Sequence, residues 1–349
     1  MIMTKTLKYL LPFSVYGLAV LAFTRTGVFT WIPLVYAFGL IPLIELFLKP
    51  DPVNMEGAEE ELARNDPFYD VILYAVVPLQ YLSLGLFLDS LDEPGLSAWD
   101  LAGRVTAMGL LCGVFGINVA HELGHRVKPF ERFLAKCLLL TSLYMHFYIE
   151  HNKGHHRHVA TPQDPSTARE NQSLYAFWMQ SLPGTFLSAW RIATGEASKK
   201  GRPFPLLFNE MAFFQIVQAA AVGMVYLAFG MKALLCFIAA ALMGGLLLEA
   251  VNYIEHYGLS RKPSGDKGFE RVKPEHSWNS DHVLGRLLLF ELSRHSDHHY
   301  LASRKYQVLR HFDEAPQMPT GYPGMILLAL VPPAWFRVMH RAMKSRQSA

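Results

Sequence analysis

Residues 232-KALLCFIAAALMGGLLLEAVN-252 decide the fold class, because they form a long and almost uninterrupted apolar run. An α-helix needs about 20 mostly apolar residues to cross the hydrocarbon core of a bilayer. The composition agrees, since 51% of the 349 residues are hydrophobic and only 17% are charged, against roughly 25% charged in soluble domains. The run therefore indicates an integral membrane protein, and the small net charge of +3 argues against a nucleic-acid partner.

Apolar segments of similar length recur between this run and the N-terminus. The first of them is not followed by a small-residue cleavage site, so we expect it to be retained as a span. Residues 49–69, which are rich in Asp and Glu, are expected to form a polar loop. The sequence thus predicts an all-α polytopic membrane protein that forms a single domain over residues 1–349. Its six predicted transmembrane helices cover residues 7–24, 28–48, 70–90, 101–120, 210–228 and 232–252.

The distribution of Lys and Arg predicts which side of the membrane each loop faces. With the N-terminus inside and six spans, 29 of the 32 Lys and Arg residues fall on the inner side. We therefore expect a protein of the inner (cytoplasmic) membrane with both termini in the cytoplasm. Within residues 130–149 the clean apolar run is too short to cross, and Pro332-Pro333 breaks the run 324–336, so both segments are expected to be re-entrant or interfacial. Residues 174–195 are expected to form an amphipathic surface helix.

Nine of the 15 histidines lie in four places at the inner ends of spans. Residues three or four apart, such as His151 and His155, are expected to point from one face of a helix. Adjacent residues such as His156 and His299 then point about 100° further round, which suits a second metal beside the first. Because the four places face the same side of the membrane, they predict one histidine-rich cytoplasmic cap. Its nine residues are His121, His125, His151, His155, His156, His256, His295, His298 and His299.

Nine imidazoles exceed the number of ligands that one metal ion takes, so the sequence predicts two ions. Imidazole suits Zn, Cu, Fe and Ni. The three cysteines form no CxxC pair, so no thiolate site or disulfide framework is expected. The other histidines are interpreted as ordinary polar residues, although His158 lies beside one motif. They are His146, His158, His276, His282, His311 and His340.

Other chemistries explain less of the pattern. HELGH (121–125) matches the HExxH zinc-protease signature with Glu122 as general base, but such a site leaves seven of the nine histidines unexplained. A carboxylate di-iron bundle would need a second Glu-x-x-His motif. A metal transporter would place its ligands near the bilayer midplane, whereas these histidines gather at span ends.

Four motifs resemble those of bacterial alkane 1-monooxygenases, in the membrane di-iron superfamily that also contains fatty-acid desaturases, fatty-acid hydroxylases and xylene monooxygenases. They are HELGHR (121–126), EHNKGHHRHVATPQDPSTAR (150–169), NYIEHYGL (252–259) and RHSDHH (294–299). The resemblance covers about residues 115–310, and NYIEHYGL is its most discriminating part. Arg126, where Lys is common, and His158 depart from the pattern, and neither is among the nine histidines.

The resemblance implies two irons held by the nine histidines, O2 as co-substrate, and terminal hydroxylation of medium-chain n-alkanes to 1-alkanols. A fatty-acid desaturase or hydroxylase, or a xylene-type monooxygenase, remains an alternative. Because two CxxC pairs are lacking, no fused rubredoxin domain is expected, and a separate rubredoxin, reduced by an NAD(P)H-dependent reductase, is expected to supply electrons. The carboxylates expected to orient ligand imidazoles are Glu122, Glu150, Asp164, Glu255 and Asp297. The basic residues expected to receive rubredoxin, or simply to reflect the positive-inside bias, are Lys128, Lys153, Arg157, Arg304, Lys305 and Arg310.

Overall fold

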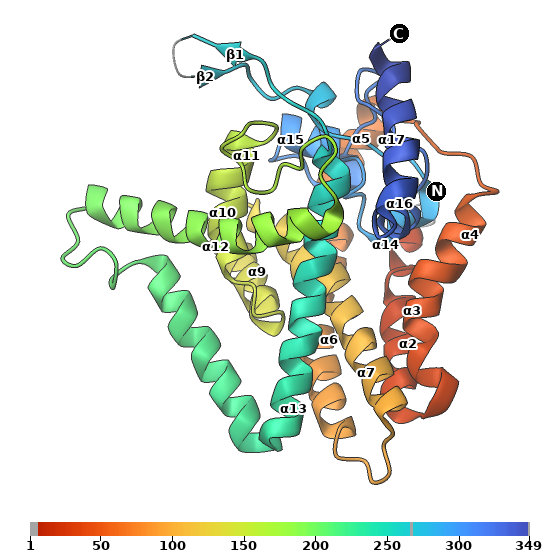
Figure 1. The fold of residues 1–349 in the computed structure, drawn as a ribbon, viewed down its shortest axis with the longest axis vertical. Coiled ribbons are helices and arrows are strands. Elements are labelled where there is room, and N and C mark those ends of the chain that lie inside the picture. The colour runs from red at the N-terminus through yellow and green to blue at the C-terminus, as the bar shows by residue number, and fades with distance from the viewer. Residues whose placement is uncertain (1–5, 266–267, 348–349) are drawn as a thin grey trace.

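The computed structural model describes residues 6–265 and 268–347, and these are mostly helical (Figure 1). Residues 1–5 and 348–349, at the two termini that are predicted to be cytoplasmic, lie outside the described residues. Two short strands, β1 (Pro263–Ser264) and β2 (Gly268–Phe269), form an antiparallel hairpin. The α-helices of the described residues are α2 (Phe13–Thr24), α3 (Ile32–Val35), α4 (Ile41–Glu45), α5 (Gly57–Asn65), α6 (Pro67–Ser90), α7 (Ala98–Leu111), α8 (Asn118–Gly124), α9 (Pro129–Thr141), α10 (His146–Glu150), α11 (His156–His158), α12 (Leu174–Lys199), α13 (Glu210–His256), α14 (Val283–Leu288), α15 (His295–Tyr300), α16 (Tyr322–Ala329) and α17 (Pro332–Gln347). Within the same residues, the π-helical segments are Tyr36–Leu40, Cys112–Ile117 and His151–His155.

Four helical stretches among the described residues are long and apolar enough to cross a membrane. The last of them holds two predicted spans, because Gly230 leaves the helical region with φ 77° and ψ −178°, and glycine adopts positive φ without a steric penalty. Figure 1 shows the result: α13 descends along one arm, turns, and returns along a second arm. The bend agrees with the predicted break between residues 228 and 232. The four stretches are Gly27–Glu45, Gly57–Ser90, Ala98–Gly124 and Glu210–His256.

The predicted polar loop at 49–69 is wrong in its second half, because α5 forms there and leads directly into α6. Arg64 in the last turn of α5 pairs with Glu60 at 2.5 Å, and such pairs four residues apart stabilise a helix. Asp66 then caps α6 by accepting a hydrogen bond from the Phe68 amide at 2.9 Å. The ion pair within α5 and the cap at the start of α6 thus stabilise helical structure in a segment that polarity alone assigned to a loop.

The predicted first span, 7–24, is shorter in the structure than the four long stretches. A 3₁₀ turn at Lys8–Leu10 precedes α2, which begins only at Phe13. Pro12 supplies the reason, because it lacks the N–H group with which a regular helix would continue from the preceding turn. The apolar stretch is therefore an interrupted helix.

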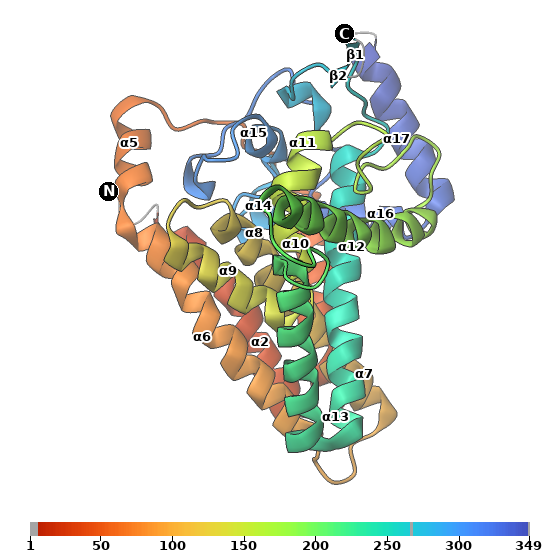
Figure 2. The same cartoon turned by 90° about the vertical axis from the view of Figure 1, so that its left-hand side faces the viewer.

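The segments that were expected not to cross the membrane form short helices or lie across the long ones. Residues 130–149 are divided between α9 and α10, and Pro332 and Pro333 stand at the start of α17 after α16 has ended at Ala329. In Figure 1, α12 runs across the second arm of α13. Figure 2 shows α10, α11, α14 and α15 gathered towards one end of the long helices. The predicted histidines are brought together at this end.

Candidate metal centre

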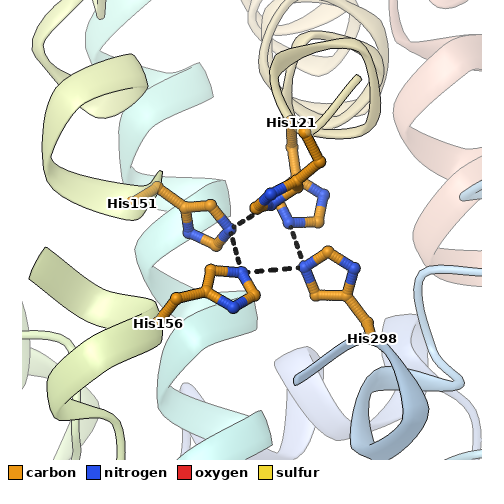
Figure 3. Close-up of side chains that lie close together, drawn as sticks. His121, His151, His156 and His298 are labelled. Atoms are coloured by element: carbon orange, nitrogen blue, oxygen red, sulfur yellow. Dashed lines mark hydrogen bonds between the residues drawn. The ribbon is translucent and has the colours of Figure 1, made fainter. Parts of the chain in front are cut away.

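Five histidines form the first group, and they come from α8, the residue that follows it, the π-helical turn, α11 and α15. One candidate ligand atom of each lies within 4.8 Å of the others. The Nε2 atom of His156 is 3.0 Å from that of His151 and 3.1 Å from that of His298 (Figure 3). The Nε2 atoms of His121 and His298 are 2.9 Å apart. The first group consists of His121, His125, His151, His156 and His298.

These contacts are too numerous to be hydrogen bonds between imidazoles. A ring nitrogen carries either one lone pair or one hydrogen in the plane of the ring. Nε2 of His156 therefore cannot bond to both His151 and His298. Two nitrogens held about 2.1 Å from one metal ion at right angles would lie about 3.0 Å apart. The observed separations fit nitrogens that converge on a shared cation.

Four buried histidines form the second group, again with their candidate ligand atoms within 4.8 Å of one another. The Nε2 atoms of His256 and His295 are 3.2 Å apart. Nε2 of His155 and both ring nitrogens of His299 are buried without a hydrogen-bond partner in the described part of the chain, which is costly unless a bound ligand satisfies them. The rings of His156 and His299 lie 4.4 Å apart, so the two groups adjoin. The second group consists of His155, His256, His295 and His299.

The backbone divides the histidines of the second motif differently from the prediction. His151 and His155 were expected to share a direction, but they belong to different groups. Residues 151–155 form a π-helical turn, in which the hydrogen bond joins residues five apart, so His151 faces His156 instead. In α15, His295 and His299 share a group, as a spacing of four residues predicts, but His298, which was expected to share their direction, belongs to the first group. The expected division of adjacent histidines between two sites agrees with both arrangements.

Two of the five predicted carboxylates touch a histidine of these groups. Asp164 Oδ2 lies 2.9 Å from Nδ1 of His155, and Glu255 Oε2 lies 3.1 Å from Nε2 of His295. The other three have different surroundings: Glu122 pairs with Arg126 at 2.6 Å, Asp297 pairs with Arg304 at 3.1 Å, and Glu150 is buried with its Oε1 lacking a hydrogen-bond partner within the described residues. Asp164 therefore makes the contact to Nδ1 that orienting an imidazole requires, whereas Glu255 approaches Nε2.

Burial favours the neutral imidazoles that ligate metals. Desolvation lowers the pKa of His298 and His299 well below the usual value, and that of His156 to about 3. For His155, burial also acts to lower the pKa, but the adjacent Asp164 carboxylate outweighs it and raises the pKa overall. Asp164 therefore holds a proton on Nδ1 of His155 and leaves Nε2 to face the second group.

The residues predicted to receive rubredoxin are largely engaged within the chain. Four of the six form ion pairs: Lys153 with Glu196 at 2.7 Å, Arg304 with Asp297 at 3.1 Å, Lys305 with Asp70 at 2.8 Å, and Arg310 with Glu60. Lys128 and Arg157 are exposed. His158 lines an open cavity of about 920 Å³ and belongs to neither histidine group.

An apolar cavity of about 70 Å³ lies among the long helices. Val251 of α13 lines it, together with residues of α2, α7 and α16. A smaller pocket that contains His121 and His298 shares Asn118 and Leu289 with this cavity. The cavity therefore leads towards the first histidine group.

Sequence reasoning missed Glu249, which is buried in the second arm of α13. Its carboxylate accepts hydrogen bonds from the Tyr144 hydroxyl at 2.8 Å and from the Asn252 amide at 3.3 Å. An acidic residue inside an apolar span is in itself a sign of function. Residues 232–252 carry this signal in the sequence, so Glu249 could have been identified from it.

Comparisons with known proteins point to one family. Residues 99–329 match the family model described as Fatty acid desaturase. The chain is 41% identical to alkane 1-monooxygenase 2 of Pseudomonas aeruginosa, over 88% of this chain and 82% of that protein. It is 37% identical to alkane 1-monooxygenase 1 of Alcanivorax borkumensis, over 92% and 79%, and 27% identical to the xylene/toluene monooxygenase hydroxylase component of Pseudomonas putida, over 96% and 88%. The chain therefore belongs to the fatty acid desaturase family and, within it, groups with the alkane 1-monooxygenases.

Proposed function

We propose that this chain is a membrane alkane 1-monooxygenase that hydroxylates the terminal carbon of medium-chain n-alkanes with O2 at a pair of irons. The observation that carries the proposal is the convergence of nine imidazoles into two adjoining groups, beside an apolar cavity. Identities of 37–41% to alkane 1-monooxygenases over most of the chain support the same reaction. An oxidoreductase of this kind accounts for both the metal donors and the apolar space.

Each histidine group would hold one iron, since imidazole is a suitable donor for it. When bound, the irons would supply the reduction of O2 and the oxidation of an unactivated C–H bond, which side chains alone cannot perform. Burial favours the neutral form of His156, His298 and His299, and the fold makes the ring nitrogens of each group converge. Asp164 contributes by accepting the Nδ1 hydrogen of His155, which fixes the ring and directs its Nε2 inward.

The apolar cavity would bind the alkane. An alkane has no polar group to recognise, so its position has to follow from the shape of an apolar space. Asn118 and Leu289 form the junction between the cavity and the pocket at His121 and His298. The Asn118 amide donates to the Leu289 carbonyl at 3.0 Å, so both polar groups are satisfied beside the hydrocarbon. The terminal carbon would therefore arrive next to the first histidine group.

The proposed topology has six transmembrane helices in the inner membrane, the last two being the arms of α13. The histidine end and both termini would face the cytoplasm, which the 29 inner Lys and Arg residues support. A separate rubredoxin would deliver two electrons per turnover at this face. The exposed Lys128 and Arg157 are the proposed contacts for it.

Turnover in membranes tests the proposal. Membranes with iron, rubredoxin, its reductase, NADH and n-octane should form 1-octanol. His256→Ala should abolish the product, because it removes a donor of the second group, whereas His158→Ala should retain it. A desaturated acyl chain in place of 1-octanol would favour the desaturase alternative, and oxidation of xylene alone would favour the xylene-type enzyme.

A further inference from the structure

Glu255 lies at the end of α13 next to His256 and is only 1% exposed. Its Oε1 accepts a hydrogen bond from the Tyr322 hydroxyl at 2.8 Å. Its Oε2 lies 3.1 Å from Nε2 of His295. The same nitrogen of His295 lies 3.2 Å from Nε2 of His256. The carboxylate oxygen therefore stands beside the nitrogens that face the second group.

Asp164 and Glu255 approach different ring nitrogens, and this difference indicates different roles for the two carboxylates. A carboxylate that only orients a metal-bound imidazole accepts the hydrogen of the outer ring nitrogen. Asp164 does this, because it contacts Nδ1 of His155 and leaves Nε2 free. Glu255 instead contacts Nε2 of His295, and one ring nitrogen cannot bond to both Glu255 and His256. The three atoms fit a shared cation better than a hydrogen bond.

From this contrast we infer that Glu255 is a metal ligand and supplies the fifth donor of the second group. The inference rests on the proposed two-iron function. The first group has five imidazoles and the second has four, so one carboxylate oxygen makes the two sites equal in donor number. Carboxylate and imidazole together are common ligands of non-haem iron.

The charge of Glu255 supports the same role. A buried carboxylate is unfavourable unless a cation or several hydrogen bonds compensate for it. Among the described residues, the structure gives Glu255 no lysine or arginine partner, and its side chain accepts one hydrogen bond from a neutral hydroxyl. A metal ion in the second group would supply the missing positive charge.

Tyr322 connects this ligand to the substrate space, because it also lines the apolar cavity. Its hydroxyl fixes one oxygen of Glu255 and leaves the other to face His295. Tyr322 is thus a positioning residue, with one side against the hydrocarbon and its hydroxyl on the carboxylate.

Mössbauer spectra of the purified, ⁵⁷Fe-loaded ferrous protein test the assignment without substrate. In Glu255→Gln, the component from one iron should shift or disappear while the other stays unchanged. Glu61→Gln is the matched control, because it makes the same chemical change at an exposed position of α5 and should keep both components at their wild-type positions. Two bound irons with an unchanged spectrum in Glu255→Gln would overturn the assignment.

Two further results separate failure of the Glu255 assignment from failure of the proposed function. If Glu255→Gln does not fold, Tyr322→Phe tests the same carboxylate by removing its hydrogen bond. This variant should shift the component of one iron only, and an unchanged spectrum would overturn the assignment. A wild-type protein that binds fewer than two irons would overturn the proposed function along with it. Two irons in the wild type with no effect of either variant would overturn the role of Glu255 alone.

Discussion

Nε2 of His151 lies 3.0 Å from Nε2 of His156, although the two residues are five positions apart. In an α-helix this spacing would turn the side chains well away from each other. The π-helical turn at residues 151–155 removes that difference and sends His155 to the neighbouring group. One short segment thereby supplies both groups, which places them side by side.

Gly154→Ala should disrupt this turn. A Cβ atom at residue 154 would lie 2.5 Å from Oε1 of Glu150 and 3.2 Å from Cδ1 of Ile192, so the turn or its neighbours must move. Overpacking of this kind costs about 1–3 kcal/mol, and we expect lower iron content and turnover reduced about ten-fold or more. The number of irons bound per chain and the rate of 1-octanol formation measure these two effects. Gly195→Ala is the control, because its added Cβ would meet nothing within 4 Å; equal behaviour of the two variants would refute the prediction.

Asp164→Asn should weaken metal binding without removing a donor. The amide cannot stabilise the Nδ1 hydrogen of His155 as a carboxylate does, and loss of such partners typically costs about 10–100-fold in metal affinity or activity. Competition with a chelator gives the affinity directly. Asp92→Asn, in an exposed turn, should leave it unchanged, and wild-type affinity in Asp164→Asn would show that the contact is incidental.

Val251→Phe should narrow the apolar cavity, which has a volume of only about 70 Å³. A misfit of one methylene in an apolar pocket changes the ratio of kcat/KM between two substrates about ten-fold or more. We therefore expect kcat/KM to fall most for the longest alkanes. A series of n-alkanes of increasing length measures the trend. Ile216→Phe makes a similar change at a position that is 68% exposed and should leave the series unaltered. A uniform loss over all lengths in Val251→Phe would instead indicate misfolding.

Arg157→Glu should weaken the encounter with rubredoxin. Charges at the edge of an interface act mainly on association rate and its salt dependence. We expect the KM for reduced rubredoxin to rise severalfold at low salt, and the difference from wild type to shrink as salt screens the charges. Arg202→Glu, also exposed, is the control. If both variants behave alike, Arg157 is only part of the positive-inside bias.

The apolar spans and the nine histidines could be predicted because both signals lie in the order of residue types. Helix length and hydropathy locate α6 and α13 without tertiary information. The division of His151 and His155 between two groups could not be predicted, because a π-helical turn does not change residue types and α-helical spacing is the default expectation. The helix α5 was missed for a similar reason, since its polar sequence resembles a loop until the Arg64–Glu60 pair is seen.

The roles of the carboxylates lay beyond the sequence for a different reason. Asp164 and Glu255 both lie near a histidine motif, and nothing in the order of residues distinguishes Nδ1 from Nε2 as the atom approached. Only the three-dimensional arrangement separates the contact to His155 from the contact to His295. Glu249, in contrast, could have been identified from its position inside an apolar span.

The most direct test of the central claim is oxygen-isotope incorporation by purified protein of known iron content. Protein with two irons per chain, supplied with reduced rubredoxin, n-octane and ¹⁸O2, should form 1-octanol that carries one ¹⁸O atom. The same protein treated with a chelator should form none, and added iron should restore the product. Unlabelled 1-octanol, or no 1-octanol from the protein with two irons bound, would contradict the assignment as an alkane 1-monooxygenase.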